Sequence, residues 1–321
     1  MTFQFVIPDP TSFSSGGNLY NQALMENLVK RGHRVIEQYQ CGACLPEADR
    51  VFWDTLHLAL LTTTNSHIPD PPGVLMAHAD TTALRTAIPR LKAIGLTFLA
   101  TGQFMVDLLL GEGIPSDRIF LLEPPVILPL PARRDRVVQA REQLSLAMAS
   151  SLTKDKGLLE FFQLGANLGR PFPDHLRIDV FGDDRIDEGY ARAIKAIWKS
   201  TAWEDIVSFQ GLLPRLQFLD RLPGYDALLS VSPSESYGMA IAEALSVGIP
   251  VLARSGGNVR NLVRDQENGL LFHDHHELIN WLMQQPGQRH LPDPSNISSN
   301  DQPSPGQVTW DAFERWLVRR S

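Results

Sequence analysis

Short apolar runs alternate with longer segments of helical periodicity along the whole chain. Such runs, bounded by polar loops, are typical of buried strands, and the segments between them repeat apolar side chains at helical spacing. In the first half, the strand-like runs are residues 3–7, 34–36, 74–77, 96–100 and 119–122. Helical stretches lie between them at residues 18–31, 83–94 and 103–113. This alternation predicts an α/β fold with a mainly parallel sheet.

The same alternation repeats in the second half of the chain. Strand-like runs occupy residues 144–149, 178–181, 207–210 and 227–231. Helical stretches occupy residues 157–168 and 186–199 and the region that follows Gly238. Between the halves, residues 123–136 carry four prolines and cannot hold regular structure for long. We therefore expect one α/β domain over residues 1–132 and a second over residues 133–306.

Near the end of the chain, a polar segment without an apolar period is followed by a segment with an apolar stripe. Residues 285–307 are rich in Pro, Ser, Asn and Gln and lack an apolar period, which predicts a flexible surface segment. An apolar stripe at helical spacing follows, made of Trp310, Phe313, Trp316 and Leu317. We expect a terminal helix within residues 307–321, with these aromatic side chains as packing anchors.

Charge and hydropathy narrow the function classes. The net charge is −7 with a pI near 5.7, which argues against broad electrostatic binding to nucleic acid. No apolar stretch approaches the roughly twenty residues that cross a bilayer, and the start lacks the features of a signal peptide. We therefore expect a cytoplasmic protein. The basic clusters Lys30-Arg31 and Arg133-Arg134-Arg136 leave peripheral contact with the inner face of a membrane open.

The cysteine, aspartate and histidine residues of the chain do not have the spacing of a complete metal site. Cys41 and Cys44 have the spacing of half a zinc site or of a redox pair, but no second Cys or His pair matches it. Asp183 and Asp184 lie at a strand end, where a loop role is simpler, and no Asp-x-Asp motif is present. The histidine cluster around His275 reads as a surface loop. We expect no metal site.

The most informative block of the chain runs from residue 235 to residue 257. Glu235 lies in a short polar loop after a strand, and Glu243 falls in the opening turns of the next helix. If the intervening residues were all helical, the two carboxylates would lie roughly 12 Å apart. A sugar joined to a nucleotide diphosphate has that reach. One carboxylate would then accept hydrogen bonds from the sugar and the other from the ribose, with the diphosphate on unpaired helix N–H groups.

This block resembles the donor-site signature of the family 4 retaining glycosyltransferases. The resemblance rests on an ordered series of motifs: Glu-x7-Glu at Glu235 and Glu243, Gly-Ile-Pro-Val at 248–251, Gly256-Gly257, and Asn-Gly-Leu-Leu-Phe at 268–272. It implies the GT-B architecture, two Rossmann-like domains with a donor cleft between them. The N-terminal domain would bind the acceptor and the C-terminal domain the nucleotide sugar, with the terminal helix crossing back to the N-terminal domain.

The same resemblance assigns roles to individual residues. It places Glu235 against sugar hydroxyls and Glu243 on the ribose, and it places His78 where relatives aim a histidine at the donor sugar. Asp80 is a weaker candidate for the acceptor. The backbone near the donor phosphates would come from Gly16, Gly17, Tyr237, Gly238, Met239, Gly256 and Gly257.

Two departures from the family pattern concern the diphosphate and the hinge. Lys156, followed by Gly157, matches the lysine that neutralises the leaving diphosphate, but Ser151 stands where relatives have an arginine. Lys154 is a possible substitute cation, although a lysine lacks the bidentate fork of an arginine. Residues 122–126 differ from the Asn-Gly found before the hinge of relatives. His78, Glu235 and Lys156 remain the candidate catalytic residues.

The resemblance implies a retaining transferase that moves a hexose or related sugar from a nucleotide diphosphate sugar, of UDP or GDP type, to an acceptor hydroxyl. The acceptor would be a small molecule, a glycan or a lipid-linked molecule, and neither a metal nor a further cofactor would be needed. A degenerate, noncatalytic relative that binds a nucleotide or glycan is the alternative, because Ser151 replaces the arginine. A dinucleotide-dependent oxidoreductase is disfavoured, because Gly-x-Gly-x-x-Gly is missing.

Overall fold

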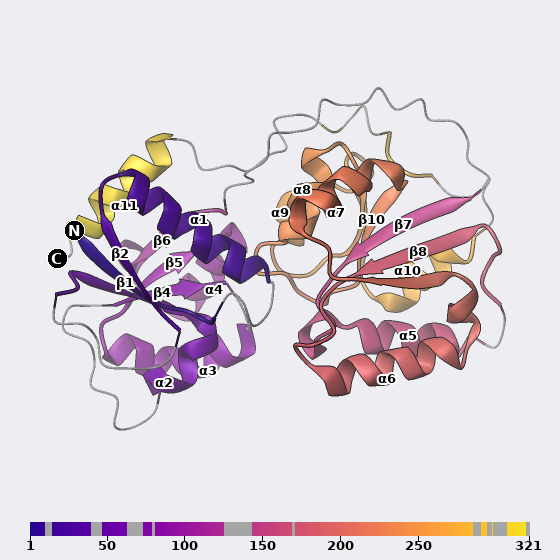
Figure 1. Ribbon diagram of the computed structural model, residues 1–321, viewed down its shortest axis with the longest axis horizontal. Helices are drawn as coiled ribbons and strands as arrows, with labels where there is room; N and C mark the ends of the chain where they lie inside the picture. The colour runs from indigo at the N-terminus through magenta and orange to yellow at the C-terminus, as the bar shows by residue number, and fades with distance from the viewer. Residues whose placement is uncertain are drawn as a thin grey trace. The chain divides into compact units, whose positions relative to one another are not determined.

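The chain forms two compact units in the computed structural model, which describes residues 1–9, 15–39, 47–62, 73–78, 81–124, 143–168, 171–284, 290–293, 297 and 307–318 (Figure 1). The first unit comprises Met1–Pro125 and Pro303–Ser321, and the second comprises Val126–Gln302. Each holds a six-stranded sheet in which all pairings are parallel. The α/β fold predicted from the alternation of runs is confirmed. Asp80, both cysteines and the basic cluster at 133–136 lie outside the described residues.

The first sheet has the strand order β2-β1-β3-β4-β5-β6. Its strands are β1 (Thr2–Val6), β2 (Arg34–Gln38), β3 (Arg50–Asp54), β4 (Val74–Ala77), β5 (Thr97–Ala100) and β6 (Ile119–Leu121). One face is covered by α1 (Gly16–Lys30) and α11 (Gln307–Val318). The other face is covered by α2 (Leu58–Thr62), α3 (Thr81–Ala93) and α4 (Gln103–Gly111).

Strand β3 was not predicted from the sequence, although all five of its residues are buried. Charged residues stand at both of its ends, so it lacks the continuous apolar run expected of a central parallel strand. Arg50 is held inside by a hydrogen bond from its guanidinium to the carbonyl of Leu317 at 3.2 Å. A buried charged side chain needs such partners.

Helix α1 also begins earlier than predicted. Its N-cap is Ser15, whose Oγ accepts a hydrogen bond from the backbone of Asn18 at 3.1 Å. Gly16 and Gly17 therefore form the first helical turn and do not form a separate loop before residue 18. A capping serine satisfies one of the N–H groups that a helix start leaves without a partner.

The second sheet has the order β12-β11-β10-β7-β8-β9, which is the 3-2-1-4-5-6 order of dinucleotide-binding folds read from the opposite edge. Its strands are β7 (Leu144–Ala149), β8 (Leu176–Phe181), β9 (Val207–Gly211), β10 (Ala227–Ser230), β11 (Val251–Arg254) and β12 (Gly269–Phe272). One face carries α5 (Leu158–Ala166), α6 (Glu188–Lys199) and α10 (His275–Leu282). The other carries α7 (Arg215–Arg221), α8 (Met239–Ser246) and α9 (Val259–Leu262).

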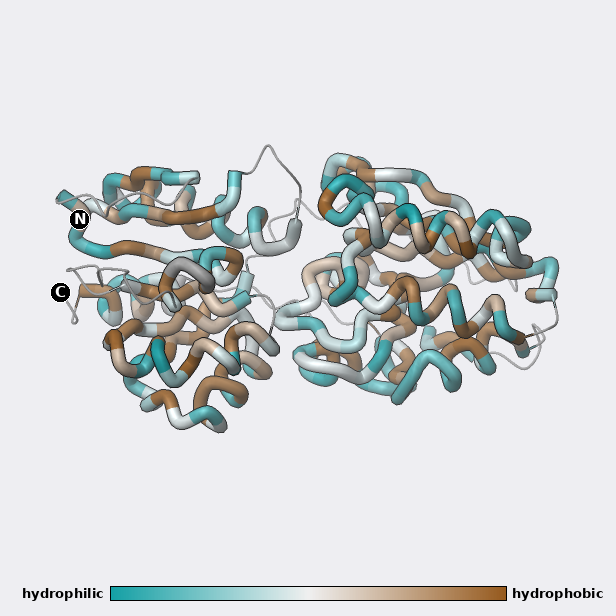
Figure 2. The backbone as a smooth tube through the Cα atoms, turned by 90° about the horizontal axis from the view of Figure 1, so that it is seen from below, coloured by the Kyte–Doolittle hydropathy of each residue, from teal (hydrophilic) through white to brown (hydrophobic). Residues whose placement is uncertain are grey.

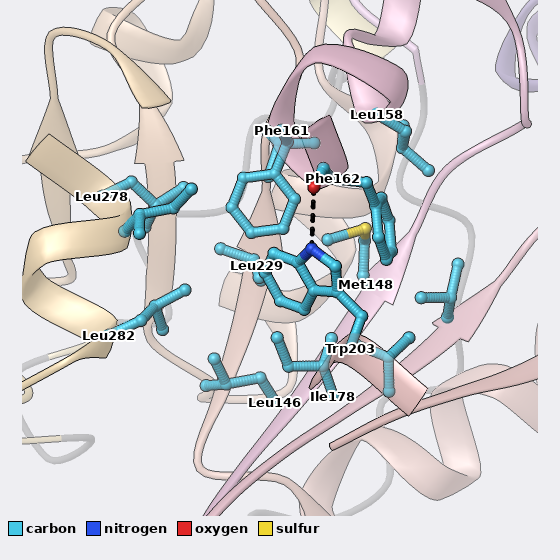
Figure 3. Close-up of a cluster of buried hydrophobic side chains, with 14 of the residues drawn as sticks. Leu146, Met148, Leu158, Phe161, Phe162, Ile178, Trp203, Leu229, Leu278 and Leu282 are labelled. Atoms are coloured by element: carbon cyan, nitrogen blue, oxygen red, sulfur yellow. Dashed lines mark hydrogen bonds between the residues drawn. The ribbon is translucent and has the colours of Figure 1, made fainter. Parts of the chain in front are cut away.

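Each sheet has apolar side chains on both faces, so each unit has its own core. Hydrophobic segments are interrupted by hydrophilic turns in both units (Figure 2). In the second unit, Trp203 is fully buried among aromatic and aliphatic side chains, and its indole N–H donates to the carbonyl of Phe162 at 2.8 Å (Figure 3). A side chain at Gly165 would collide with the same indole ring, which explains a glycine inside α5.

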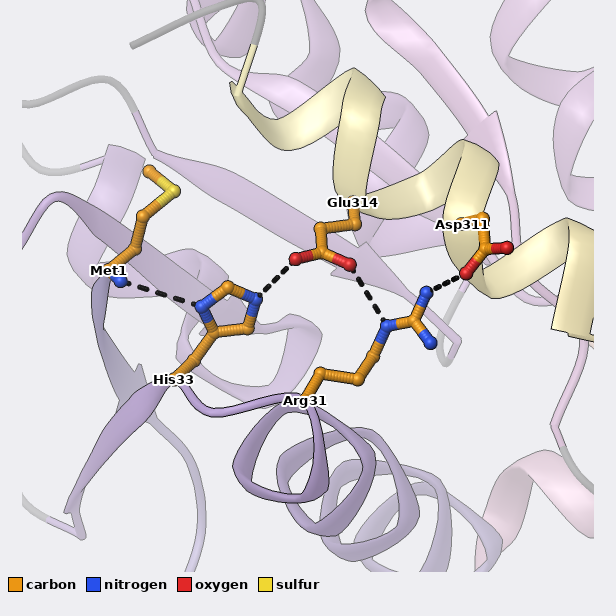
Figure 4. A network of polar contacts seen from close by, with 5 residues as sticks. All are labelled: Met1, Arg31, His33, Asp311 and Glu314. Carbon is orange, nitrogen blue, oxygen red and sulfur yellow. Dashed lines mark hydrogen bonds and ion pairs between the residues drawn. The ribbon is translucent and has the colours of Figure 1, made fainter.

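The C-terminal helix α11 packs on the first unit. Trp310, Phe313 and Leu317 are buried in the core that contains β1 and α1. A polar network joins the same elements: Arg31 pairs with Asp311 and with Glu314, and His33 Nε2 lies 3.0 Å from Glu314 (Figure 4). Within the described residues, no helix combines the length and apolar character needed to span a bilayer.

Candidate functional site

The second sheet brings two candidate residues together at the point where its strand order reverses. Strands β7 and β10 are neighbours, and the chain leaves them toward helices on opposite faces, α5 and α8. In open parallel sheets, ligands bind outside the carboxyl ends of the strands at such a position. The segment after β7 carries Lys156, and the segment after β10 carries Glu235. The sequence predicted both as site residues, and the fold places them side by side.

Lys156 and Glu235 form an ion pair. The ammonium nitrogen of Lys156 lies 3.1 and 3.0 Å from the two carboxylate oxygens. Both side chains are partly exposed, at 26% and 16%. Burial lowers the pKa of Lys156, but the charges of Glu235 and Asp155 outweigh that effect and raise it. A charged lysine is therefore available for an anionic ligand, and a carboxylate beside it can accept hydrogen bonds from hydroxyls.

Glycine 157 explains how the Lys156 turn approaches this loop. It has a left-handed conformation with φ of 68°, where glycine is favoured. A Cβ there would lie 2.9 Å from the ring of Pro233, so a larger residue would push the two segments apart.

Gly256 and Gly257 hold the loop that carries Glu235. The carbonyl of Glu235 accepts a hydrogen bond from Asn258 at 2.7 Å, and a Cβ on either glycine would collide with the backbone of this loop. The N–H of Gly256 donates to the carbonyl of Arg254 at 2.9 Å. The structure thus gives the glycine pair a local packing role next to Glu235.

The start of α8 lies beside the same loop. Gly238 is its N-cap with φ of 93°, and Met239 is its first helical residue. Tyr237 is buried, and its carbonyl accepts a hydrogen bond from the side chain of Asn258 at 2.9 Å. The first N–H groups of a helix have no partner within the helix, so this end favours an anion.

Glu243 lies inside α8 and is largely buried, at 6% exposure. Its carboxylate forms an ion pair with Arg215, with 2.6 Å between Oε1 of Glu243 and Nε of the guanidinium. Burial raises the pKa of Glu243, and the charge and hydrogen bond of Arg215 offset part of that rise. The sequence predicted Glu243 but gave no sign of Arg215, whose position as the first residue of α7 follows only from the fold.

A second polar cluster lies in the first unit, at the carboxyl ends of the adjacent strands β3 and β4. His78 follows β4, and its Nε2 lies 3.1 Å from an oxygen of Asp54, the last residue of β3. That carboxylate also accepts from the side chain of Asn21 at 2.6 Å and from the backbone of Leu56 at 2.8 Å. Burial raises the pKa of Asp54, but His78 and these hydrogen bonds together bring it below its usual value.

Gly17 lies against the imidazole of His78. A Cβ at this position would lie 2.8 Å from Cε1 and 3.0 Å from Nδ1 of the ring. Tyr20 meets the ring edge-on, with 6.0 Å between the ring centroids. The predicted residues Gly17 and His78 therefore belong to one cluster, with Gly16 directly before it in α1. Asp54 was missed because β3 was missed.

The interpretation of the histidine cluster as a surface loop is wrong for His275. This residue opens α10, and its side chain is buried against Phe161 with Nε2 2.8 Å from the carbonyl of Val231. Burial lowers its pKa. Among the described residues, no cluster of His, Cys, Asp and Glu has the composition to hold a metal ion. Asp183 forms an ion pair with Arg185, with 2.7 Å between the two side chains.

Sequence comparison relates the second unit to a known family. Residues 132–297 match the family described as "Glycosyl transferases group 1". A D-inositol 3-phosphate glycosyltransferase of Xylanimonas cellulosilytica is 26% identical over 222 residues, which cover 67% of this chain and 51% of that protein. An alpha-monoglucosyldiacylglycerol synthase of Streptococcus pneumoniae is 26% identical over 111 residues, 35% of this chain and 24% of that protein. The chain spans about half the length, or less, of these curated relatives.

Solved structures extend the likeness over both units. Sucrose-phosphate synthase from Thermosynechococcus elongatus has a TM-score of 0.70 at 14% identity and covers 100% of both chains. Anabaena Alr3699/HepE, solved in complex with UDP and glucose, has a TM-score of 0.68 at 16% identity and covers 98% of this chain and 99% of its own. At such identities the likeness concerns the fold, and it confirms the predicted GT-B class of two Rossmann-like domains.

Proposed function

The chain belongs to the glycosyl transferases group 1, and from this premise we propose that it moves a hexose or related sugar from a nucleotide diphosphate sugar to an acceptor hydroxyl. The observation that carries the proposal is the Lys156–Glu235 pair at the strand-order reversal of the second sheet. A cation for a diphosphate and a carboxylate for sugar hydroxyls are the two groups that such a donor needs side by side.

In this proposal, donor binding separates the pair. The diphosphate forms an ion pair with the ammonium group of Lys156, and the carboxylate of Glu235 then accepts hydrogen bonds from the sugar. The helix start at Tyr237, Gly238 and Met239 supplies N–H groups for the phosphates. Because a lysine and a helix start compensate the charge of the leaving group, no metal is required.

The remaining residues complete the donor site. Glu243, oriented by Arg215, accepts from the ribose hydroxyls. Gly256 and Gly257 keep the Glu235 loop in place, and Gly16 and Gly17 are the further glycines proposed to offer backbone N–H groups to the donor phosphates.

The reaction proposed is a transfer with retention of anomeric configuration. A phosphate oxygen of the donor takes the proton of the acceptor hydroxyl on the face that the diphosphate leaves, so no protein nucleophile is needed. His78 is the residue proposed to contact the sugar, and Asp80 the residue proposed to contact the acceptor. The donor is of UDP or GDP type, and UDP is supported by the fold neighbour that was solved with UDP and glucose.

Ser151 favours one alternative, a degenerate relative that binds a nucleotide or glycan without turnover. Because Ser151 replaces an arginine at this position, the site lacks a charge-assisted contact to phosphate that would be worth about 1.5 to 3 kcal/mol. The alternative predicts nucleotide binding without hydrolysis of the donor.

The test is thermal unfolding with UDP, GDP, ADP and TDP, each at about one hundred times its dissociation constant. Bound ligand then stabilises the chain by about 2.7 kcal/mol, which is a shift of several degrees. We expect one nucleotide to shift the wild type and to shift Lys156→Gln much less. Lys199→Gln, at the far end of α6, is the matched control and should respond like wild type.

Hydrolysis of the matching nucleotide sugar then separates the two functions. Release of sugar from the donor supports the transferase, whereas binding without release supports the degenerate relative. No shift with any nucleotide, from folded protein, contradicts both.

A further inference from the structure

Arg215 and Glu243 meet because two helices of the second unit share one face of its sheet. Helices α7 and α8 lie on that face, and apolar side chains of both pack in one cluster (Figure 1). Arg215 is the first residue of α7, and Glu243 lies in the middle of α8. Nε of Arg215 lies 2.6 Å from Oε1 of Glu243. The pair therefore joins the helix that follows β9 to the helix that follows the Glu235 loop.

Both members of this ion pair are shielded from water. The side chain of Glu243 is 7% exposed and that of Arg215 is 21% exposed. Nε and Nη2 of Arg215 are buried and have no hydrogen-bond partner among the described residues. A buried charge is costly unless an opposite charge compensates it, and removing one partner leaves the other uncompensated. Each group therefore stabilises the charged form of the other.

Arg215 is the cation that acts on the Glu243 carboxyl. Burial raises the pKa of Glu243, and the positive charge of Arg215 opposes that rise. The elements packed around α8 carry four other charged residues, each of which is exposed or has a different neighbour: Asp220, Arg221, Arg254 and Arg260. Without Arg215, the buried carboxyl would take up a proton more readily.

We propose that Arg215 is a positioning residue that holds Glu243 as an ionised hydrogen-bond acceptor for ribose hydroxyls, so that the pair selects nucleotides with an intact ribose. This inference rests on the proposed function for the identity of the ligand. It adds the residue that keeps the acceptor charged, and the part of the nucleotide that the pair distinguishes.

The charge of Glu243 decides how strongly the ribose is bound. A hydrogen bond from a hydroxyl to a carboxylate is about twice as strong as one between neutral groups. A protonated Glu243 carries its own O–H donor and retains only a neutral oxygen as acceptor. The preference for a nucleotide with ribose hydroxyls should therefore follow the ionisation of Glu243.

The first measurement needs no ligand. Carbon NMR of the full chain with ¹³C-labelled glutamate follows the titration of the carboxyls, and Glu243→Gln identifies the Glu243 signal. We expect Glu243 to be ionised at about pH 7 in wild type and to titrate at a higher pH in Arg215→Gln, because the buried carboxyl loses its cation. Arg215→Lys keeps a positive charge and should restore a titration close to that of wild type.

The second measurement compares UDP with 2′,3′-dideoxy-UDP, which lacks both ribose hydroxyls, by isothermal calorimetry. Wild type should bind UDP about 10- to 100-fold more tightly. In Arg215→Gln the preference should be smaller at about pH 6 and recover in part at about pH 9, where the carboxyl ionises again. A purely structural role of Arg215 would instead weaken both nucleotides equally at both pH values.

Arg221→Gln is the matched control, because it removes an exposed arginine from the same helix. It should leave the titration of Glu243 and the preference for UDP unchanged.

Three results overturn the proposal: a protonated Glu243 at neutral pH in wild type, an unchanged titration of Glu243 in Arg215→Gln, or equal affinities of wild type for the two nucleotides. The first and third come from wild type alone, so they decide even if Arg215→Gln does not fold. If wild type does not bind UDP, the proposed function fails for this nucleotide, and the titration still decides whether Arg215 keeps Glu243 charged.

Discussion

At the scale of single residues, Ser151 is the clearest departure from the family pattern in the proposed donor site, because relatives have an arginine at this position. Ser151 follows β7 and precedes the turn that carries Lys156. We expect Ser151→Arg to strengthen UDP binding about tenfold, because a guanidinium forms bidentate, charge-assisted hydrogen bonds with phosphate. Isothermal calorimetry at low and high salt measures the gain, which should shrink as salt rises.

The uncharged variant Ser151→Gln is the control for side-chain size, and it should bind UDP like wild type. Equal gains in both variants would assign the effect to packing. A weaker affinity in Ser151→Arg would show that the diphosphate does not approach this position.

Residues that belong to a local motif could be predicted from the sequence, whereas their partners could not. Lys156, Glu235 and Glu243 stand in short motifs with fixed spacing. Arg215 and Asp54 carry no such pattern. Each meets its partner only because neighbouring elements bring distant segments together, as β3 and β4 do for Asp54 and His78. A single sequence holds no signal for such a pair.

At the scale of elements, helix α10 depends on its cap. Asp274 accepts a hydrogen bond from the backbone of Glu277 at 2.9 Å, and that bond chiefly lowers the pKa of Asp274. A carboxylate with a lowered pKa adds stability above its usual pKa and loses it as pH falls through the folded value. We expect Asp274→Ala to lower the melting temperature at pH 7, with a smaller difference from wild type in acid. Thermal scans at both pH values measure this difference.

The exposed Asp220, inside α7, provides the comparison. Asp220→Ala should leave the melting temperature within about a degree at either pH, since exposed surface changes have small effects. A difference for Asp274→Ala that stays constant into acid would contradict the role of the charge in the cap.

Elements with a strong apolar run were predictable, and those with mixed composition were not. Strands β4, β5 and β7 follow their runs closely. Strand β3 begins with Arg50 and ends with Asp54, so its buried centre is too short to stand out in the sequence. The two charged end residues of β3 are buried because each has a hydrogen-bond partner from a distant part of the chain. Arg50 donates to the carbonyl of Leu317, and Asp54 accepts from the side chain of Asn21.

At the scale of the whole molecule, the fold class could be predicted because strand-like runs and helical segments alternate in both halves of the chain, and each half forms a complete sheet. What the alternation does not give is the strand order. That order places β7 beside β10, and with it Lys156 beside Glu235. The pattern of apolar residues predicts individual helices and strands, whereas the order of the strands in the sheet depends on how the helices pack on both faces of that sheet.

The chain end stabilises the unit that holds the chain start, so a substitution in α11 should weaken the first unit selectively. Phe313 is fully buried against the core around β1 and α1. Phe313→Ala should cost about 3 to 5 kcal/mol there, because it removes apolar contacts and leaves a cavity. Hydrogen exchange should show lost protection in β1 and α1 and unchanged protection in β7 and β8. Val318→Ala, at an exposed site of the same helix, should change neither. Equal losses in both sheets would mean that the two units unfold as one.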